Sequence, residues 1–401
     1  MHLTEPVTYK SFFEPSFLNE SHIKAALNSA ILHQAKENFR IWVERSENSN
    51  FSDIVIQTPL FENESIEEWT KRIFKENKFC LLFSQVEQFN DDLAVLASQF
   101  LKPLFEKRGI TLGGTSLTVF LGNYGFTPSG VHQDQDENCI FHFHLGPGYK
   151  ELMTWDPHEF EKLTGSKEAY FETEKILPHA KVFGLYPNDF LFLPTKYYHI
   201  GKTDQFSVDF VVVLSDCSNI KLTEDIFNNL MAEGLARNKK TYKLDLVDME
   251  ESITTMTRNM MNHLCINPEK RQDSFENVIK SQMEDRYLSM LSNFNFSYPP
   301  RLNQKSTHDL KSRSIKIKEP FKIYYKKIEN NKMAVFFRGR ELVAPHYPFI
   351  VQLIDHINIS STLNVEDVTK QFATNDQDKK IILSFLSQAI EHHAIKLIVA
   401  K

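Results

Sequence analysis

The chain has 401 residues, of which 41% are apolar and 24% are charged, and its formal net charge is −6. This composition is that of a globular protein with room for two or three domains, and it gives no overall positive charge to attract nucleic acid or an anionic membrane. The four cysteines form no Cys-x-x-Cys pair, which argues against a zinc knuckle or a disulfide framework and favours a reducing compartment. We therefore expect a cytoplasmic protein without a signal peptide, and no apolar run reaches the roughly 20 residues of a membrane span.

The first 110 residues mix helical and strand patterns. Residues 12–39 are predicted to be helical, with Asn19-Glu20-Ser21 as the start. Residues 79–83 have the pattern of a buried strand. Residues 91–101 carry apolar side chains at helical spacing after Asp91 and Asp92, which suit a helix N-terminus.

Residues 111–217 are dominated by short β-branched and aromatic runs that are separated by turn residues. The predicted strands are 116–121, 139–145, 152–155, 180–183, 190–193 and 207–214. Many short strands at this spacing indicate a barrel or a sandwich. The polar and acidic residues 157–178 interrupt them and are expected to be partly helical.

The rest of the chain changes character twice. Residues 218–300 show helical spacing and no strand pattern, and Pro299-Pro300 ends them. Residues 301–318 are polar and rich in Lys and Arg, as in a linker. Residues 319–401 are predicted to form a hairpin (321–325 and 333–337), three short helices and a closing strand (395–399), which is the outline of a winged helix. Four parts follow: 1–217, 218–300, 301–318 and 319–401.

Two stretches of the strand-rich part carry the side chains of a metal site. His132 and Asp134 are two residues apart, so on a strand they point to the same face. His199 follows a second predicted strand, at the end of the apolar run that begins at Phe190. Two imidazoles and one carboxylate on one face of a metal form the arrangement of non-haem Fe(II) oxygenases. The alternative is that these histidines are structural or solvated.

The second stretch, from Asn188-Asp189 through Pro194 to His199, resembles a motif of the Jumonji-C (JmjC) branch of the cupin superfamily. Asn188 stands where the family has glycine, a mild departure because Asn tolerates positive φ. The resemblance implies an α+β fold around a double-stranded β-helix (jelly-roll or cupin) barrel with flanking helices. It also implies Fe(II) held by His132, Asp134 and His199, 2-oxoglutarate as cosubstrate and O2 as oxidant.

Such enzymes anchor the far carboxylate of 2-oxoglutarate on a cation from a barrel strand. Lys150, which follows the turn Gly146-Pro147-Gly148-Tyr149, is the candidate that the resemblance implies. Asn138 and Ser129 stand where related enzymes place polar groups that contact the cosubstrate, and Tyr124 borders the same pocket in this interpretation. A solvated lysine is the alternative for Lys150.

His142 and His144 offer a competing metal site, because they alternate with phenylalanines and share one strand face. Cupin sites commonly combine such a His-x-His pair with a following glutamate, and Glu151 is the candidate here. We favour the first site, since residues 130–134 already complete a set of three ligands. In that case His142 or His144 lines the pocket of the cosubstrate or substrate.

The layout of barrel, helical segment and small C-terminal domain resembles that of bacterial ribosomal oxygenases. That resemblance implies a homodimer formed through residues 218–300, and hydroxylation of a side chain in a protein or peptide. The insertion between Asp134 and Gly146 and the long segment 157–178 both change the mouth of the barrel, so the ribosomal substrate itself is not carried over. Residues 319–401 also resemble peptide-recognition domains that bind a leader peptide as an added strand, with residues 336–340 as the expected edge.

Other functions remain open at this point. The basic run 311–327 suits a nucleic acid, but the predicted recognition helix carries Glu366 and Asp367 and repels phosphate, so we do not expect nucleic-acid binding. A small-molecule (amino-acid) hydroxylase and a cupin-type dioxygenase without 2-oxoglutarate are the enzymatic alternatives. A non-catalytic interaction module is the third class, and the presence of all three ligand types argues against it.

Overall fold

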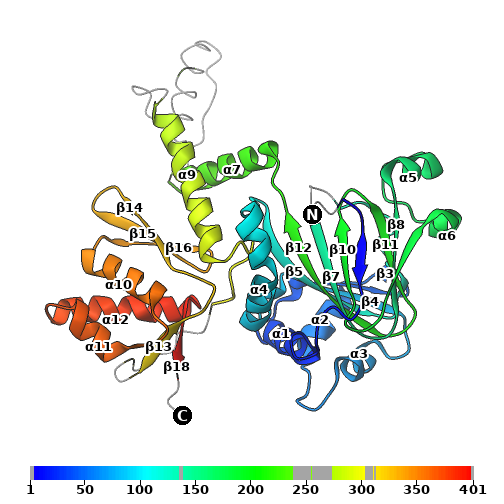
Figure 1. Cartoon of the computed structure of the whole chain (residues 1–401), viewed down its shortest axis with the longest axis horizontal. Helices are drawn as coiled ribbons and strands as arrows, with labels where there is room; N and C mark the ends of the chain where they lie inside the picture. The colour runs from blue at the N-terminus through cyan, green and yellow to red at the C-terminus, as the bar shows by residue number, and fades with distance from the viewer. Residues whose placement is uncertain are drawn as a thin grey trace, which may run out of the picture.

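The computed structural model describes residues 4–134, 139–237, 254, 273–302, 310 and 313–398. Within these residues, helices are combined with four sheets whose strands pair in the antiparallel sense. Figure 1 shows the strand-rich part on one side and a smaller C-terminal part on the other. The predicted α+β class with antiparallel strands is confirmed.

The strand-rich part holds two of these sheets. The eight-stranded sheet has the order β1 (Val7–Tyr9), β10 (Phe190–Pro194), β7 (Cys139–Pro147), β12 (Ser207–Ser215), β5 (Gly114–Gly122), β4 (Phe79–Ser84), β2 (Phe39–Val43) and β3 (Ser46–Glu47). The four-stranded sheet has the order β6 (Gly125–Phe126), β11 (Tyr198–Thr203), β8 (Lys150–Trp155) and β9 (Lys181–Leu185). From β5 to β12 the chain crosses between the two sheets at every step except from β8 to β9. Each predicted strand in this region is present, whereas β6 and β11 were not predicted.

The strands β7 and β10 are buried on both faces. Phe141, Phe143 and Phe190 belong to the core beneath helix α4 (Asp91–Arg108), where the ring of Phe100 contacts all three. The alternate residues, such as Leu191, belong to a second core between the two sheets. Burial on both faces explains the nearly continuous apolar runs. It also means that every second residue of β7, including His142 and His144, faces the space between the sheets.

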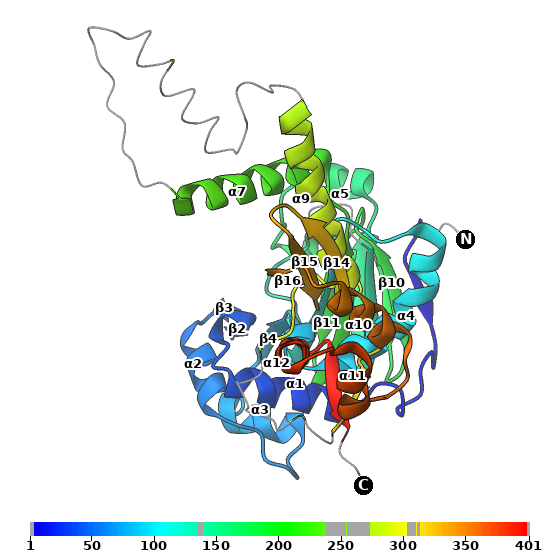
Figure 2. The ribbon, with the colours of Figure 1, turned by 90° about the vertical axis from the view of Figure 1, so that its left-hand side faces the viewer.

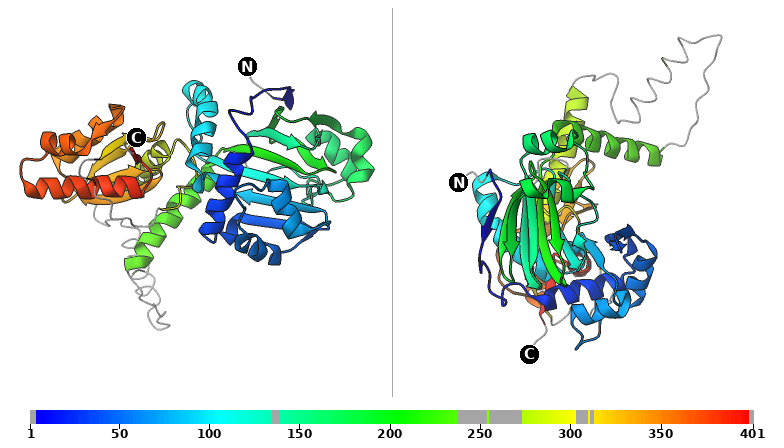
Figure 3. Two further views of the ribbon diagram at one scale, coloured as in Figure 1. Left: turned by 90° about the horizontal axis from the view of Figure 1, so that it is seen from below. Right: turned by 90° about the vertical axis from the view of Figure 1, so that its right-hand side faces the viewer.

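Helices cover the outer face of the eight-stranded sheet, as Figure 3 shows from two sides. They are α1 (Glu20–Leu32), α2 (Asn50–Gln57), α3 (Ile66–Phe74) and α4. The expected helix 12–39 is confined to α1, which starts after Asn19, whose side chain accepts a hydrogen bond from the Ser21 amide. Residues before it are not helical, because the Phe12 amide donates instead to the carbonyl of Asn188.

The insertion between β8 and β9 is partly helical, as expected, with α5 (Pro157–Thr164) and α6 (Thr173–Ile176). Its main contact with the sheet is the ring of Phe160, which stacks on the ring of Tyr198 with centroids 3.7 Å apart. Because Tyr198 begins β11, this contact braces the strand next to His199.

The segment after the sheets begins and ends with helices, α7 (Asn219–Arg237) and α9 (Asp273–Ser292). They lie against each other in Figure 2, and Arg286 of α9 donates to Asp225 of α7 at 2.9 Å. Most residues between the two helices lie outside the described part of the chain, so the homodimer stays a prediction. No helix in the described ranges is long and apolar enough to cross a membrane.

The C-terminal part contains two three-stranded sheets and three helices. One sheet has the order β17 (Leu363–Asn364), β13 (Ser314–Ile317) and β18 (Ile395–Ile398), and the other has the order β14 (Tyr324–Ile328), β15 (Lys332–Phe337) and β16 (Arg340–Pro345). The helices are α10 (Pro348–Ile359), α11 (Val365–Phe372) and α12 (Asp376–Glu391). The predicted hairpin is β14–β15, with Asn330 and Asn331 at positive φ in its turn. The third strand, β16, was not predicted.

Two sequence-based assignments in this part need correction. Residues 314–317, placed in the linker, form the central strand β13, because Ile315 and Ile317 are buried between the lysines that suggested a linker. Residues 336–340 are not a free edge. Phe336 and Phe337 lie in β15, which pairs with a strand on each side, and both are fully buried. Among the described residues, the outer strands of this sheet are β14 and β16.

A buried ionic cluster joins the C-terminal part to α4. The carboxylate of Asp91, in the first turn of α4, accepts from Arg338 at 2.9 Å and from His393 at 2.8 Å, and it also pairs with Lys318. The guanidinium of Arg338 is buried and lies 3.4 Å from the ring centroid of Phe321. The two parts are therefore held together at the end of α4 that faces the C-terminal sheets.

Candidate metal centre

Three side chains predicted from the sequence converge at one end of the two sheets. His132, Asp134 and His199 each offer a ligand atom, and these atoms all lie within 4.8 Å of one another. The backbones of His132 and His199 are joined by a pair of hydrogen bonds of 3.1 and 2.8 Å. One correction applies: His199 does not end the strand that starts at Phe190. That strand stops at Pro194, and His199 is the second residue of β11.

Both imidazoles turn their Nε2 atoms toward Asp134 and their Nδ1 atoms toward the backbone. The Nδ1 of His132 lies 2.9 Å from the carbonyl of Gly130, and the Nδ1 of His199 lies 3.2 Å from the carbonyl of Tyr197. Since a carbonyl only accepts, each Nδ1 carries the proton and each Nε2 has a free lone pair. Ser129, expected near the cosubstrate, lies 3.4 Å behind the Nδ1 of His132 instead. A serine there supports the orientation of the ring.

The distances fit a metal ion after a small closing movement. The Nε2 of His132 and of His199 lie 3.8 and 3.7 Å from the carboxylate of Asp134. Ligand atoms about 2.1 Å from one ion and at right angles to each other lie about 3 Å apart, so a shift of under about 1 Å suffices. One oxygen of Asp134 is buried and has no hydrogen-bond donor among the described residues. Such an orphaned carboxylate oxygen between two lone pairs suits a cation.

The protonation state of His199 also suits a ligand. Its pKa is lowered to about 4, with burial as the largest cause; the carboxylate of Asp134 acts in the opposite direction, and His132 adds to the lowering. His199 is therefore neutral near pH 7, which is the form that binds metals.

The turn before β10 is fixed by a second carboxylate. Asn188 stands where the motif has glycine, and its φ of 71° lies in the left-handed region that glycine adopts easily and that Asn tolerates. Next to it, Asp189 accepts from the amides of Tyr186 and Ser11 at 2.8 and 2.9 Å and from Lys10 at 2.7 Å. Asp189 thus has a structural role, because it ties the turn before β10 to the residues that follow β1.

Lys150 lies between the two sheets and is almost fully buried. Its Nζ donates to a carboxylate oxygen of Asp209 at 2.6 Å and bonds to the hydroxyl of Tyr124. Burial alone lowers the pKa of Lys150, but Asp209 and Tyr124 outweigh it and hold that pKa above its usual value. Lys150 passes close to Gly201, where a Cβ would lie 3.5 Å from the lysine Cε. Lys150 and Tyr124 were thus singled out from the sequence, whereas the counter-ion of Lys150, Asp209, was not.

The competing set of His142, His144 and Glu151 does not assemble. His142 donates from Nδ1 to Asp209 at 2.7 Å, and His144 is fully buried on the same face. Glu151 belongs to the opposite face of β8 and pairs with Lys202 at 3.7 Å. Asp209, which accepts from both Lys150 and His142, was not singled out from the sequence. Its signal was a single carboxylate within the otherwise apolar run of β12.

Asn138, the last of the expected site residues, lies outside the described residues, so its role stays a prediction. A hollow of about 1210 Å³ lies between α4 and the outer face of the eight-stranded sheet. It is thus separated from the candidate centre by the sheet itself.

No protein-family model matches the chain, and no curated protein matches it. Among solved structures, the chain is similar to the X-ray structure of Escherichia coli YcfD, with 13% identity, a TM-score of 0.49 and coverage of 98% of this chain and 95% of that one. It is also similar to YcfD described as a ribosomal oxygenase in complex with cobalt and 2-oxoglutarate, with 14% identity, a TM-score of 0.49 and the same coverage.

A cupin superfamily protein from Desulfitobacterium hafniense matches a smaller part, with 12% identity, a TM-score of 0.18 and coverage of 26% of this chain and 69% of that one. These likenesses concern overall shape and assign no role to any residue of this chain. The bacterial ribosomal oxygenases, whose layout the sequence resembles, are nevertheless among the solved structures to which the chain is similar.

Proposed function

We propose that the chain is an Fe(II)- and 2-oxoglutarate-dependent dioxygenase that hydroxylates a side chain of a protein or peptide. The observation that carries this proposal is the convergence of His132, Asp134 and His199, with two Nε2 lone pairs and an orphaned carboxylate oxygen within 4.8 Å. Two imidazoles and one carboxylate would hold a divalent ion and would leave room on it for other ligands.

The surrounding fold supports the proposal. Eight strands, β5 to β12, divide between two facing sheets with crossings at nearly every step, as in a jelly-roll barrel. The three side chains lie at the end where β11 begins. The space between the sheets is lined by apolar residues such as Leu191 and Val211, which keep water away from a reacting group.

Each residue has a defined task in this proposal. Bound iron supplies O2 chemistry, in which 2-oxoglutarate is converted to succinate and CO2 while a substrate C–H bond gains one oxygen atom. His132, Asp134 and His199 hold the metal, and the carbonyls behind the two imidazoles fix their tautomers. Lys150 and Tyr124 hold the distal carboxylate of 2-oxoglutarate through a charged and a neutral hydrogen bond.

The direct test is succinate formation by the purified chain with Fe(II), ascorbate and 2-oxoglutarate. We expect succinate to form slowly without substrate and faster with lysate proteins, one of which gains the mass of one oxygen atom. Succinate without any protein product, but with a hydroxylated amino acid, would favour the small-molecule alternative. No 2-oxoglutarate consumption under any condition would favour a cupin-type dioxygenase and reject the proposal.

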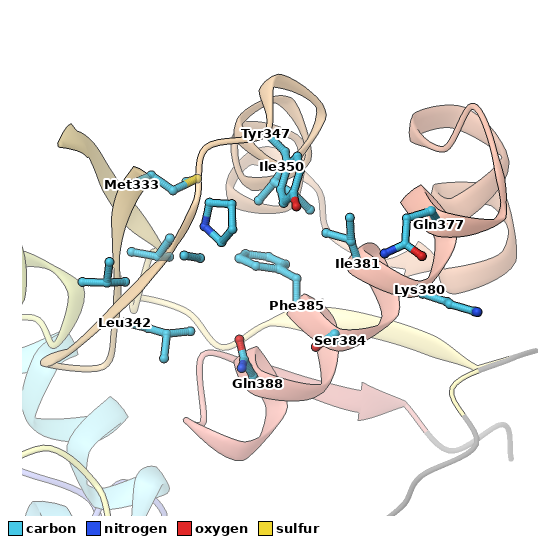
Figure 4. A pocket seen from close by; sticks show the side chains of 14 residues that line it. Met333, Leu342, Tyr347, Ile350, Gln377, Lys380, Ile381, Ser384, Phe385 and Gln388 are labelled. Atoms are coloured by element: carbon cyan, nitrogen blue, oxygen red, sulfur yellow. The ribbon is translucent and has the colours of Figure 1, made fainter. Parts of the chain in front are cut away.

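For the polypeptide substrate, we propose that the free edge of β16 and the groove beside it form a docking site. The groove has a volume of about 470 Å³ and lies between β16 and α12, with Leu342 on one side and Ile381 and Phe385 on the other (Figure 4). Partly buried and exposed residues alternate along β16. An extended peptide can add to such an edge through its backbone, with every second side chain in the groove.

The winged-helix-like outline does not favour nucleic acid as the partner. Helix α11 carries Glu366 and Asp367 in its first turn, and its lysine, Lys370, is paired with Glu366 at 2.8 Å. Phosphate would meet a surface without free positive charge on this helix.

Replacing Val343 with aspartate tests the docking site. Val343 lines the groove and is 51% exposed, so the change adds a charge to the groove without opening the core. We expect the KM for the hydroxylated protein to rise about tenfold or more, while succinate formation without substrate stays unchanged. The matched control is Lys327→Asp on β14, the other edge, which should leave this KM unchanged. An equal KM in the two variants would reject docking at β16.

A further inference from the structure

A buried imidazole between the candidate metal centre and Lys150 has one nitrogen without a partner. The Nδ1 of His142 donates to an oxygen of Asp209 at 2.7 Å, whereas its Nε2 is buried and has no hydrogen-bond partner in the part of the chain that the structure describes. The whole residue is 6% exposed. Burying a polar atom without a partner is costly, so this nitrogen indicates a ligand that the protein binds there.

The register of the strands places His142 between the candidate metal centre and Lys150. At one end of β7, Cys139 pairs with Pro194, from which the chain turns into β11 and His199. The other end of β7 leads through a tight turn into Lys150. His142 lies between these two ends, on the inner face of the strand.

The cluster of Lys150, Asp209 and His142 has no spare positive charge to offer to an additional anion when His142 is neutral. The Nζ of Lys150 and the Nδ1 of His142 share one oxygen of Asp209, at 2.6 and 2.7 Å. The lysine and the aspartate cancel, so with a neutral His142 the buried cluster has no net charge. Adding a carboxylate brings one negative charge into a region of low dielectric, where an uncompensated charge is strongly unfavourable.

We propose that His142 is a second anchor for the distal carboxylate of 2-oxoglutarate: it takes up a proton as the cosubstrate binds, and its Nε2–H then donates to the carboxylate beside Lys150. This inference rests on the proposed function and adds to it. Asp209 accepts from both cations, which keeps the protonated imidazole in place. The proton comes from solvent, so the cluster is again neutral once the carboxylate is bound.

The other titratable groups around His142 do not provide this proton. Burial raises the pKa of Cys80 and of Tyr124 to about 12, so both stay neutral. Burial lowers the pKa of His144, whose Nε2 already donates to the carbonyl of Gly148 at 2.7 Å. Among the described residues, the charged groups of the cluster are Lys150 and Asp209, and the neutral His199 lies toward the candidate metal centre.

The test is calorimetric binding of 2-oxoglutarate to the Zn(II)-loaded protein near neutral pH, in two buffers with different ionisation enthalpies. We expect the wild type to take up about one proton per cosubstrate bound. His142→Asn keeps a donor to Asp209 and removes Nε2, so it should take up no proton and bind about 10- to 100-fold more weakly. The matched control, His144→Gln, keeps the bond to Gly148 and should behave as the wild type.

The outcomes separate the two proposals. A wild-type protein that does not bind 2-oxoglutarate contradicts the proposed function. A wild type that binds it without proton uptake overturns the role of His142 alone, even if the variants fail to fold. Equal affinity and equal proton uptake in His142→Asn and the wild type would overturn it as well.

Discussion

Replacing Asp134 with alanine is expected to abolish cosubstrate turnover, because it removes the single carboxylate of the candidate metal centre. The two remaining ligands are imidazoles, which carry no negative charge, so the site loses its only negative charge toward a divalent ion. Changing a residue behind a ligand typically weakens metal binding by 10- to 100-fold, and loss of a ligand should exceed about 100-fold. Calorimetric titration with Co(II), which is stable in air, measures this loss without any assay of activity.

The matched control is Glu151→Ala. Glu151 is the carboxylate of the competing His142 and His144 set, and it pairs with Lys202 on the outer face of β8. We expect this variant to bind Co(II) as the wild type does. If Glu151→Ala loses the metal and Asp134→Ala keeps it, the ligand assignment is wrong.

The candidate ligands could be predicted because their signals are local in the sequence. His132 and Asp134 are separated by one residue after a glycine turn, and His199 follows an apolar run ended by Pro194. What could not be predicted is how His199 meets the other two. It does so through β11, a strand that starts with Tyr198 and includes Gly201 and Lys202, and this mixed composition hides the strand. The backbone pairing of His132 with His199 depends on that strand.

The counter-ion Asp209 was missed for a different reason. Its partners Lys150 and His142 belong to two other strands, one in each sheet, and nothing local links them. Only the register of β7 on β12 and the closeness of the two sheets bring these three side chains together. A lone carboxylate in an apolar strand signals a buried partner, because a buried charge needs one, but the sequence does not identify it.

In the C-terminal part, two predictions from amino-acid composition were wrong, and in one of them the alternation of apolar and polar residues indicated the right structure. The lysines around Ile315 and Ile317 suggested a linker, yet the alternate isoleucines place a central strand there. The aromatic pair at the end of β15 suggested an exposed edge, but full burial of Phe336 and Phe337 follows from pairing on both sides. The outer strand on that side of the sheet is β16, which was not predicted from the sequence.

The second large effect concerns Lys150, whose removal is expected to damage stability as well as binding. In Lys150→Met, the carboxylate of Asp209 stays buried and loses the cation at 2.6 Å. Removing one partner of a buried ion pair costs roughly 3–5 kcal/mol of unfolding free energy. A loss of cosubstrate binding in this variant alone would therefore not separate binding from folding.

The double variant Lys150→Met/Asp209→Asn makes that separation. The amide that replaces the carboxylate of Asp209 is uncharged, so no unpaired charge remains buried in the core. The double variant should therefore recover most of the unfolding free energy that Lys150→Met loses. It still lacks the cation, so it should not recover 2-oxoglutarate binding. Urea unfolding gives the first quantity, and calorimetry on the Zn(II)-loaded protein gives the second. Lys175→Met, at the exposed pair with Glu172, is the control and should leave both unchanged. Wild-type affinity in the double variant would place the cosubstrate anchor elsewhere, and wild-type stability in Lys150→Met would show that Asp209 is not buried as a charge.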